Sequence, residues 1–378
     1  MNSAAELARK NVKGLETCVH GGEVWEVAHE KGLSIRDLVD FSSSINPLGP
    51  SPRALEAMKN SFEQLSLYPD SDATALREAI ASHFGGINKS NVVVGNGSTE
   101  LIYLFAQIFL KKGDLAVIPA PTFGEYANVA VRNRSKLKHV RMSRDFQLEP
   151  DVFKLEMKGA KSVFLCNPNN PTSMLIPHEA VVEILEEALR KDVVVFLDED
   201  FIEFVNDENR NSFVKVINKY PNLFILRTFT KFYGLTGLRV GYGIGDEETI
   251  EVFSKVKMPW NVNSLAQTAA IAALADKDHS RKTMETVRIE RQFLIRELSQ
   301  IIGFKVFPAE SNFIFLDVRE SNFTAAQLKG MMLTQGILVR DCSSFAGLDA
   351  YYVRVAVRTR QENERLLNGL RRVLKLAC

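Results

Sequence analysis

Val92-Val-Val-Gly-Asn-Gly-Ser-Thr-Glu100 is the stretch that decides the fold, because it runs from an apolar strand through a glycine-rich turn into a helix. Residues 92–94 are β-branched, as in a buried strand, and residues 99–110 repeat apolar side chains at three- and four-residue spacing. The free N–H groups and the dipole of such a helix can hold a phosphate, here at Gly97, Ser98 and Thr99. A Gly-Asn-Gly turn is also commonly only a tight turn with an N-cap, so the motif by itself leaves both interpretations open.

Short apolar runs alternate with longer amphipathic ones from about Asn91 onward, which predicts an α/β fold with a mostly parallel sheet flanked by helices. A second helix of this part of the chain is expected at residues 178–190. The further strands of the sheet are expected at residues 115–118, 162–166, 193–197, 223–226 and 239–244.

After Pro259 the pattern changes and predicts a second, smaller α+β domain. A helical stretch over 264–298, interrupted around 276–279, is followed by strands at 312–318, 337–340 and 352–357 and a helix at 361–374. With 378 residues, of which 46% are hydrophobic, the chain is long enough for more than one core. We expect an N-terminal arm at 1–48 that reaches the small domain and the substrate, a large domain at 49–262 and a small domain at 263–378.

Composition narrows the class of protein. The 47 basic and 46 acidic residues leave a formal charge of +1, which provides no field for attracting nucleic acid or an anionic membrane. Residues 1–15 lack the apolar core of a signal peptide, and no apolar run approaches the roughly 20 residues of a membrane helix. The cysteines show neither a disulfide framework nor metal-binding spacing; they are Cys18, Cys166, Cys342 and Cys378. We therefore expect a cytoplasmic protein without a nucleic-acid partner, a membrane partner or a metal.

Lys231 lies among hydroxyls and small residues in Arg227-Thr-Phe-Thr-Lys-Phe-Tyr-Gly-Leu-Thr-Gly-Leu-Arg239. A free lysine titrates near ~10.4, so a lysine that forms an imine needs a site that lowers its pKa by desolvation or by a cation such as Arg239. The Arg239 guanidinium could also bind a phosphate beside the hydroxyls of Thr228 and Thr230. Taken alone, the segment is also compatible with a basic loop whose lysine faces water.

Polar or aromatic residues follow three further predicted strands, so they are expected at one edge of one sheet, where open α/β sheets bind ligands. Asp198 would need a cation there, such as the pyridinium nitrogen of pyridoxal phosphate. Its run Asp198-Glu-Asp200 is also typical of a metal site or a solvated turn, although no histidine ligand pattern accompanies it. Asn170 offers an uncharged amide and Phe123 an aromatic face, with a plain turn and core packing as the alternatives.

Together these motifs resemble the pyridoxal-phosphate-dependent aminotransferase superfamily of fold type I over nearly the whole chain. The resemblance implies that Lys231 carries pyridoxal 5'-phosphate as an imine, that Asp198 pairs with the pyridine nitrogen and that Asn170 contacts the phenolic oxygen. Phe123 would stack on the ring. Residues implied to hold the phosphate are Ser98, Thr99, Thr228, Thr230 and Arg239. The resemblance also implies a homodimer with shared active sites, in which Tyr68 reaches the phosphate of the partner subunit.

Several stretches are similar to the histidinol-phosphate aminotransferase branch of that superfamily, and especially to the L-threonine O-3-phosphate decarboxylases of cobamide synthesis. They are His20-Gly-Gly-Glu-Val-Trp25, Asp40-Phe-Ser-Ser-Ser-Ile-Asn-Pro-Leu-Gly49, Val339-Arg-Asp-Cys-Ser-Ser-Phe-Ala-Gly-Leu348 and Val353-Arg-Val-Ala-Val-Arg-Thr-Arg360. The resemblance implies that Arg354 binds the substrate carboxylate, and that His20, Asn46 and Arg340 help to hold a dianionic substrate. A dianion that enters a dry site needs such cationic and polar partners.

Two positions depart from the branch: Phe201 stands where its aminotransferases commonly carry tyrosine, and Ser173 where they usually carry glycine. We therefore expect decarboxylation of L-threonine O-3-phosphate to (R)-1-amino-2-propanol O-2-phosphate and carbon dioxide. The alternative is transamination of histidinol phosphate with 2-oxoglutarate. A third hypothesis, a non-catalytic ligand sensor, predicts a missing lysine or a fused DNA-binding segment. Lys231 is present, and no helix-turn-helix with a basic face precedes Gly95.

Overall fold

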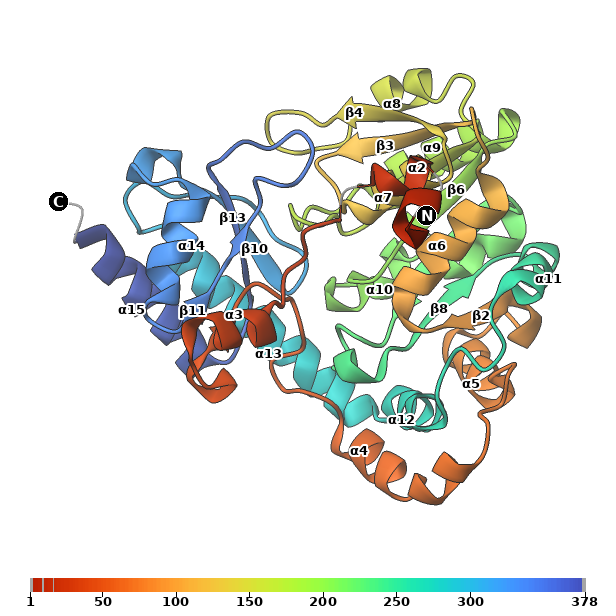
Figure 1. Ribbon diagram of the computed structural model, residues 1–378, viewed down its shortest axis with the longest axis horizontal. Coiled ribbons are helices and arrows are strands. Elements are labelled where there is room, and N and C mark those ends of the chain that lie inside the picture. The colour runs from red at the N-terminus through yellow and green to blue at the C-terminus, as the bar shows by residue number, and fades with distance from the viewer. Residues whose placement is uncertain (1–2, 9, 16, 376–378) are drawn as a thin grey trace.

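A seven-stranded sheet forms the larger part of the computed structural model, which describes residues 3–8, 10–15 and 17–375 (Figure 1). The strand order is β2-β8-β7-β6-β5-β3-β4, and only β8 runs antiparallel to its neighbours. The predicted α/β fold with a mostly parallel sheet is therefore confirmed. The strands are β2 (Val92–Gly95), β3 (Leu115–Ala120), β4 (Lys136–Arg141), β5 (Ser162–Cys166), β6 (Val194–Asp198), β7 (Leu223–Thr228) and β8 (Gly241–Ile244).

The sequence analysis missed β4. Its residues, Lys136-Leu-Lys-His-Val-Arg141, lie at the edge of the sheet, and only Val140 is buried. An edge strand that faces solvent carries charged side chains and lacks the continuous apolar run of the central strands.

Both faces of the sheet are buried, because successive side chains of a strand point to opposite sides. Phe164, Phe196 and Phe224 pack on one face with Phe105 of α6, whereas Val163, Val195 and Ile225 belong to the core on the other face. The helices of the large part are α4 (Pro52–Lys59), α5 (Thr74–Phe84), α6 (Gly97–Phe109), α7 (Glu125–Arg132), α8 (Pro150–Glu156), α9 (His178–Arg190), the short α10 (Glu208–Asn211), α11 (Glu247–Val256) and α12 (Ser264–Ala275).

A four-stranded antiparallel sheet of order β12-β13-β10-β9 forms the smaller α+β layer that the sequence predicts. Its strands are β9 (Lys305–Val306), β10 (Phe313–Asp317), β12 (Arg340–Asp341) and β13 (Tyr352–Ala356). The long helix α13 (Lys277–Leu298) runs beside it together with α14 (Ala325–Leu333) and α15 (Arg360–Lys375) (Figure 1). The predicted interruption of the helical stretch is a single residue, Asp276, whose side chain caps α13.

The N-terminal segment spans both parts of the molecule. Its first helices, α1 (Ala4–Leu7) and α2 (Lys10–Lys13), are seen in front of α7 in the large part, and α3 (Val24–Lys31) is seen at the small part (Figure 1). Strand β1 (Val39–Asp40) then pairs in parallel with β11 (Ile337–Leu338). The chain therefore passes from one layer to the other before residue 48. The domain boundaries at residues 48 and 262 stay predictions.

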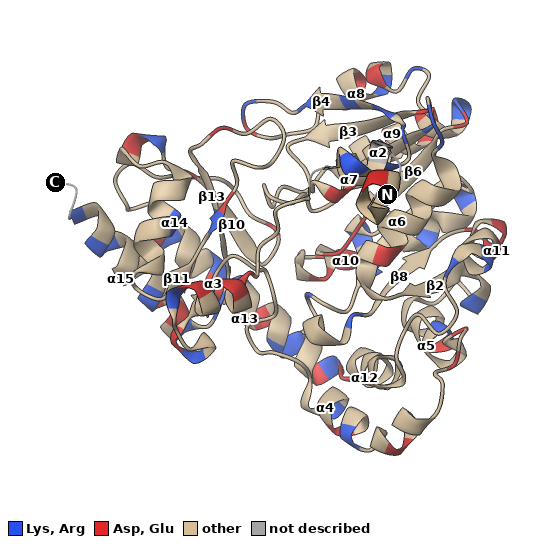
Figure 2. Cartoon of the chain, in the orientation of Figure 1, with Lys and Arg blue, Asp and Glu red and all other residues tan. Residues whose placement is uncertain are grey.

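Lys and Arg are interspersed with Asp and Glu over the outer helices (Figure 2). Among the helices that the structure describes, none is long and apolar enough to cross a membrane. Cys18, Cys166 and Cys342 are free thiols, and Cys378 lies outside the described residues.

Gly243 of β8 provides a test of the packing between the sheet and its helices. A Cβ atom at this position would lie 2.1 Å from Cζ of Phe224, whose ring is fully buried and stacks on Phe253 at 4.3 Å. We expect Gly243→Ala to destabilise the protein by about 1–3 kcal/mol or more through overpacking, measured as a lower thermal midpoint.

Gly330 within α14 is the matched control, because nothing lies within 4 Å of a Cβ atom built there. Gly330→Ala should leave the midpoint unchanged or raise it, since alanine is favoured over glycine in a helix by about 0.5–1 kcal/mol. Equal midpoints for the two variants would contradict this account of the packing.

Candidate active site

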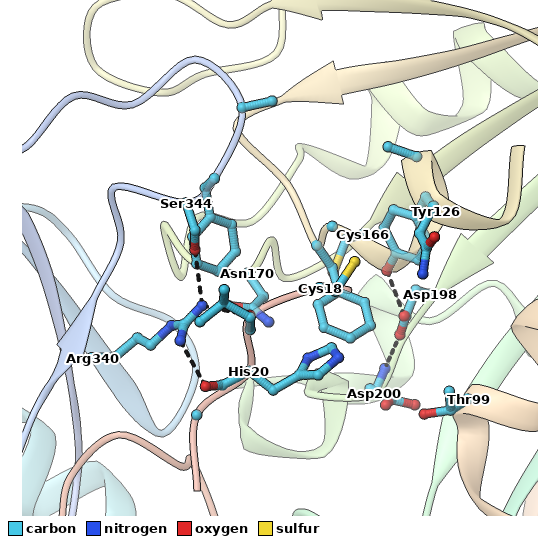
Figure 3. A pocket seen from close by; sticks show the side chains of 18 of the residues that line it. Cys18, His20, Thr99, Tyr126, Cys166, Asn170, Asp198, Asp200, Arg340 and Ser344 are labelled. Carbon is cyan, nitrogen blue, oxygen red and sulfur yellow. Dashed lines mark hydrogen bonds between the residues drawn. The ribbon is translucent and has the colours of Figure 1, made fainter. Parts of the chain in front are cut away.

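A cavity of about 870 Å³ opens at the carboxyl ends of the parallel strands, between the large sheet and the small one. The N-terminal arm supplies part of its wall (Figure 3). The predicted site residues that line it are His20, Thr99, Phe123, Asn170, Asp198, Lys231, Arg239, Arg340 and Arg354. The sequence argument that strand ends would bring such residues together is thus supported by the fold.

Asp198 is the last residue of β6 and is almost completely buried. Its Oδ2 accepts a hydrogen bond from the Tyr126 hydroxyl at 2.5 Å, and its Oδ1 accepts one from the backbone N–H of Asp200 at 2.9 Å (Figure 3). Burial raises the pKa of Asp198, and the neighbouring Asp200 carboxylate raises it further. No cationic side chain of the described residues lies within 4.0 Å, so the carboxylate can accept one from a ligand.

Lys231 follows β7, and its backbone is fixed by a hydrogen bond from the Asn46 N–H to its carbonyl oxygen at 3.1 Å. Burial lowers the pKa of the Lys231 amine. The carboxylates of Asp200 and Asp198 oppose this shift, whereas Arg354 and Arg239 add to it. In the part of the chain that the structure describes, the Nζ atom has no ion-pair partner.

The turn from β2 into α6 is built around Arg239. A Cβ atom on Gly97 would lie 2.5 Å from a guanidinium nitrogen of Arg239, so a side chain there would displace the guanidinium. Gly97 also has a φ of +75°, which a side chain rarely adopts. Gly241 of β8 allows the same turn to approach, because its Cβ would lie 2.6 Å from the Ser98 nitrogen. The result is a cradle of backbone N–H groups beside one arginine.

Four predicted phosphate residues are not lining residues of the cavity: Gly97, Ser98, Thr228 and Thr230. The Ser98 hydroxyl donates to Oδ2 of Asp200 at 2.8 Å, and the hydroxyls of Thr228 and Thr230 lie 2.9 Å apart. They adjoin the cavity through Asp200, Arg239 and Lys231, which do line it.

Arg340 and Arg354 approach from the small sheet as direct partners across β12 and β13, so both side chains lie on the same face. Arg354 donates to the carbonyl of Ser42 at 2.7 Å and to the side-chain oxygen of Asn170, while its Nε has no partner. Burial lowers the pKa of Arg354 to about 10. Neither guanidinium has a carboxylate within 4.0 Å among the described residues.

The N-terminal arm lines the cavity, and two of its backbone carbonyls accept hydrogen bonds from Arg340. This guanidinium donates to the carbonyls of Val19 and His20, each at 2.7 Å, and to the Ser344 hydroxyl at 3.1 Å. Figure 3 shows its contacts with His20 and Ser344. The His20 ring in turn donates from Nε2 to Glu125 at 2.9 Å. Burial alone would raise the pKa of Glu125, but hydrogen bonds from His20 and from Tyr103, Asn128 and Cys18 lower it to about 2.

Asn46 and Tyr68, two further predicted site residues, do not line the cavity. The Asn46 amide donates to the carbonyl of Phe232 and to Thr283, and its oxygen accepts from Leu48, so this conformation leaves no donor for a substrate. Tyr68 is 80% exposed and stacks on Trp260 at 4.6 Å, away from the cavity of its own chain.

The structure shows what surrounds Phe201 and Ser173, the two residues that depart from the family pattern. Phe201 is buried, meets Phe313 edge to face at 5.0 Å, and has its ring centre 6.0 Å from the Lys231 amine. Ser173 adopts a φ of +61°, a conformation that glycine takes more readily. Its hydroxyl accepts a hydrogen bond from the Ser311 N–H at 2.9 Å, which ties this turn to the segment before β10.

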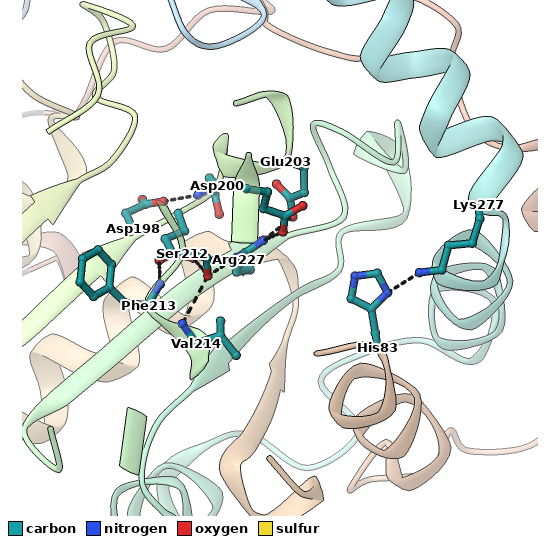
Figure 4. A network of polar contacts seen from close by, with 11 residues as sticks. His83, Asp198, Asp200, Glu203, Ser212, Phe213, Val214, Arg227 and Lys277 are labelled. Carbon is teal, nitrogen blue, oxygen red and sulfur yellow. Dashed lines mark hydrogen bonds and ion pairs between the residues drawn. The ribbon is translucent and has the colours of Figure 1, made fainter. Parts of the chain in front are cut away.

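The side chains of the acidic run Asp198-Glu-Asp200, at the end of β6, lie in two different environments. Asp198 and Asp200 line the cavity, whereas Glu199 pairs with Arg227 at 2.8 Å. Figure 4 shows Arg227 beside Ser212 and Glu203. Arg227 is fully buried on β7 and also pairs with Glu203 and Glu208. The described residues contain no group of three or more His, Cys, Asp or Glu side chains that could hold a metal ion.

Sequence reasoning missed Tyr126, Glu125 and Asp200, because their partners lie far away in the chain. One signal was available for the buried network of Arg227. An arginine inside the apolar strand 223–228 needs an acidic partner, and Glu199 follows the neighbouring strand.

The class I and II aminotransferase family matches residues 36–370, and the chain belongs to that family. It is 37% identical to a histidinol-phosphate aminotransferase from Methanothermobacter thermautotrophicus, with 96% of each chain covered. Further relatives with 32–36% identity over nearly the whole chain carry the same description.

Two solved structures bear on the branch. The histidinol-phosphate aminotransferase from Clostridium acetobutylicum is 31% identical, with a TM-score of 0.84 over 89% of this chain and 99% of that one. The L-threonine-O-3-phosphate decarboxylase from Porphyromonas gingivalis is 26% identical, with a TM-score of 0.79 over the same shares. The special similarity to the decarboxylases that the sequence analysis expected is therefore corrected, because the aminotransferases are the more similar proteins.

The cofactor is pyridoxal 5'-phosphate, as in the class I and II aminotransferases. The residues present fit this group. Asp198 offers a buried carboxylate without a cation, Lys231 an amine without an ion-pair partner, and the turn at Gly97 a cradle that a side chain would fill.

Proposed function

We propose that this chain transfers the amino group of histidinol phosphate to 2-oxoglutarate. The observation that carries the proposal is the pair of buried arginines, Arg340 and Arg354, which face the cavity without carboxylate partners among the described residues. A buried cation without a counter-ion is costly unless a ligand supplies the negative charge. Both substrates do so, since one is a phosphate ester and the other a dicarboxylate. The relatives with 32–37% identity support the same branch.

Residues at the strand ends would hold the cofactor. Lys231 would attach it through its amine, Asp198 would accept a hydrogen bond from its ring nitrogen, and Asn170 would contact its phenolic oxygen. When bound, the cofactor supplies an electron-withdrawing ring that stabilises negative charge at the α-carbon of the substrate. Asp198 supports this by keeping a proton on the nitrogen.

Lys231 would serve next as the base and acid of the reaction. Burial lowers its pKa, so its free amine is neutral in a larger fraction of molecules and can take the proton from the α-carbon. Arg354 and Arg340 would hold the phosphate or carboxylate of the substrate and so orient that carbon toward the amine. His20 and the arm would close the cavity above the substrate and exclude water.

One observation favours a second candidate, decarboxylation of L-threonine O-3-phosphate. Phe201 has no hydroxyl to donate to the phenolic oxygen of the cofactor, and so departs from the aminotransferases that commonly carry tyrosine at this position. The same arginines would hold a substrate that carries both phosphate and carboxylate. In this reaction the bond to the carboxylate must break in place of the C–H bond.

An assay with both substrates separates the two candidates. We expect the enzyme, loaded with cofactor, to form glutamate from histidinol phosphate and 2-oxoglutarate, and to stop when the acceptor is omitted. Release of carbon dioxide from threonine phosphate without an acceptor, together with no formation of glutamate, would overturn the proposal in favour of the decarboxylase.

Arg354→Met tests the anion site. We expect kcat/KM to fall by at least about 30-fold for each substrate, since losing one partner of a buried charged contact costs about 2 kcal/mol or more. The visible absorbance of the bound cofactor should stay. Arg281→Met is the control, because its side chain is 75% exposed on α13. Unchanged kinetics in Arg354→Met would remove this residue from the site.

We also propose that the active form is a homodimer in which Tyr68 reaches the cofactor phosphate of the partner. Apolar side chains gather around Tyr68 where the segment before α5 meets the end of α11. Leu65, Leu67 and Met258 are 65%, 68% and 72% exposed in the single chain. Such a patch favours burial against another protein surface. Light scattering should give twice the mass of 42.4 kDa, whereas the mass of one chain would contradict the dimer.

A further inference from the structure

Asp200 is an acidic side chain that lies beside the turn expected to hold the cofactor phosphate. It lines the cavity, only 9% of the residue is exposed, and it follows the strand-end residue Asp198 by two positions. Its Oδ2 accepts a hydrogen bond from the hydroxyl of Ser98, which lies in the first turn of α6 and belongs to the phosphate cradle. Asp200 is therefore held against the cradle by a direct hydrogen bond.

The other oxygen of Asp200 is buried and unpartnered. Oδ1 accepts no hydrogen bond from any described residue, although the Asp198 carboxylate nearby makes two. A buried carboxylate oxygen without a donor is costly, and a phosphate dianion placed beside it would raise that cost by like-charge repulsion. Protonation of this oxygen removes both penalties, because a carboxylic acid donates where a carboxylate can only accept.

We propose that Asp200 binds the cofactor phosphate as a neutral carboxylic acid, with Oδ1–H donating to a phosphate oxygen while Oδ2 keeps its hydrogen bond from Ser98. This inference rests on the cofactor assignment. It refines the role predicted for Ser98, whose hydroxyl would hold Asp200 while the backbone N–H groups of the turn hold the phosphate. The proton comes from solvent when the phosphate binds, so one proton is taken up for each Asp200 that was ionised.

The charged and titratable groups around Asp200 set the pH range of this uptake. Burial raises the pKa of Asp200 to about 6, and the Ser98 hydrogen bond limits the rise. The other titratable groups that interact electrostatically with Asp200 are Lys231, Arg227, Arg239, Asp198 and Cys166. An added phosphate dianion raises the pKa further. Binding should therefore take up a proton above about pH 6 and weaken as the pH rises through this window.

The test uses the full-length chain freed of cofactor and pyridoxine 5'-phosphate, which carries the same phosphate but lacks the aldehyde that reacts with Lys231. Isothermal titration in buffers of different ionisation heat gives the affinity and the number of protons taken up at each pH. Asp200→Asn keeps the shape of the side chain and cannot be ionised. The ionisation of the ligand's own phosphate occurs with both proteins and cancels in the comparison.

We expect the wild-type chain to take up more protons than Asp200→Asn above pH 6. Its affinity should fall by up to about tenfold per pH unit more steeply than that of the variant, which should bind more tightly at pH 8. Equal proton uptake, or weaker binding of Asp200→Asn at every pH, would overturn the proposal. Binding by neither protein would instead overturn the cofactor assignment.

Ser98→Ala provides a second test, should Asp200→Asn fail to fold. Removing the hydroxyl takes away the hydrogen bond that favours the ionised form of Asp200, so proton uptake should shift to higher pH. An unchanged pH profile in Ser98→Ala would equally count against Asp200 as the proton acceptor.

Discussion

The candidate active site depends on buried charges that have no ion-pair partner among the described residues. The carboxyl ends of the parallel strands meet at one edge of the sheet. Polar residues at these ends, such as Asp198 and Lys231, therefore line the same cavity. The small sheet brings Arg340 and Arg354 to the opposite wall as cross-strand partners. Isolated charges of this kind are expensive to bury. The fold maintains them because helices and sheets on both sides fix their positions, and a cofactor and substrates of opposite charge would compensate them.

The contrast with Arg227 shows the difference between a structural and a functional charge. Arg227 is even more deeply buried than Arg354, but it pairs with Glu199, Glu203 and Glu208. Its network holds the turn after β6, so that Asp198 and Asp200 face the cavity while Glu199 faces away. A completed network stabilises the strand ends. The charges around the cavity, which lack such partners among the described residues, are available to bind charged ligands.

Much of the large sheet and many of the site residues could be predicted, because strand periodicity and strand-end motifs are local properties of the sequence. Lys231, Asp198 and Asn170 each follow or end a predicted strand, and the structure brings all three to one cavity, while their roles there stay predictions. Glu125 and Asp200 were not foreseen, since their hydrogen bonds join residues about a hundred positions apart. The terminal stretches and Phe201 suggested a decarboxylase, whereas the similarity over the whole chain favours the aminotransferases, because a few positions carry less information than the full length.

Attachment of the cofactor to Lys231 is the central claim, and chemical trapping tests it most directly. Borohydride reduction of the protein loaded with pyridoxal 5'-phosphate should fix the cofactor irreversibly to one lysine, which peptide mass spectrometry then locates. The account predicts the cofactor mass on Lys231, and no trapped cofactor in Lys231→Ala. Trapping on another lysine in the wild-type protein, or undiminished trapping in the variant, would contradict it.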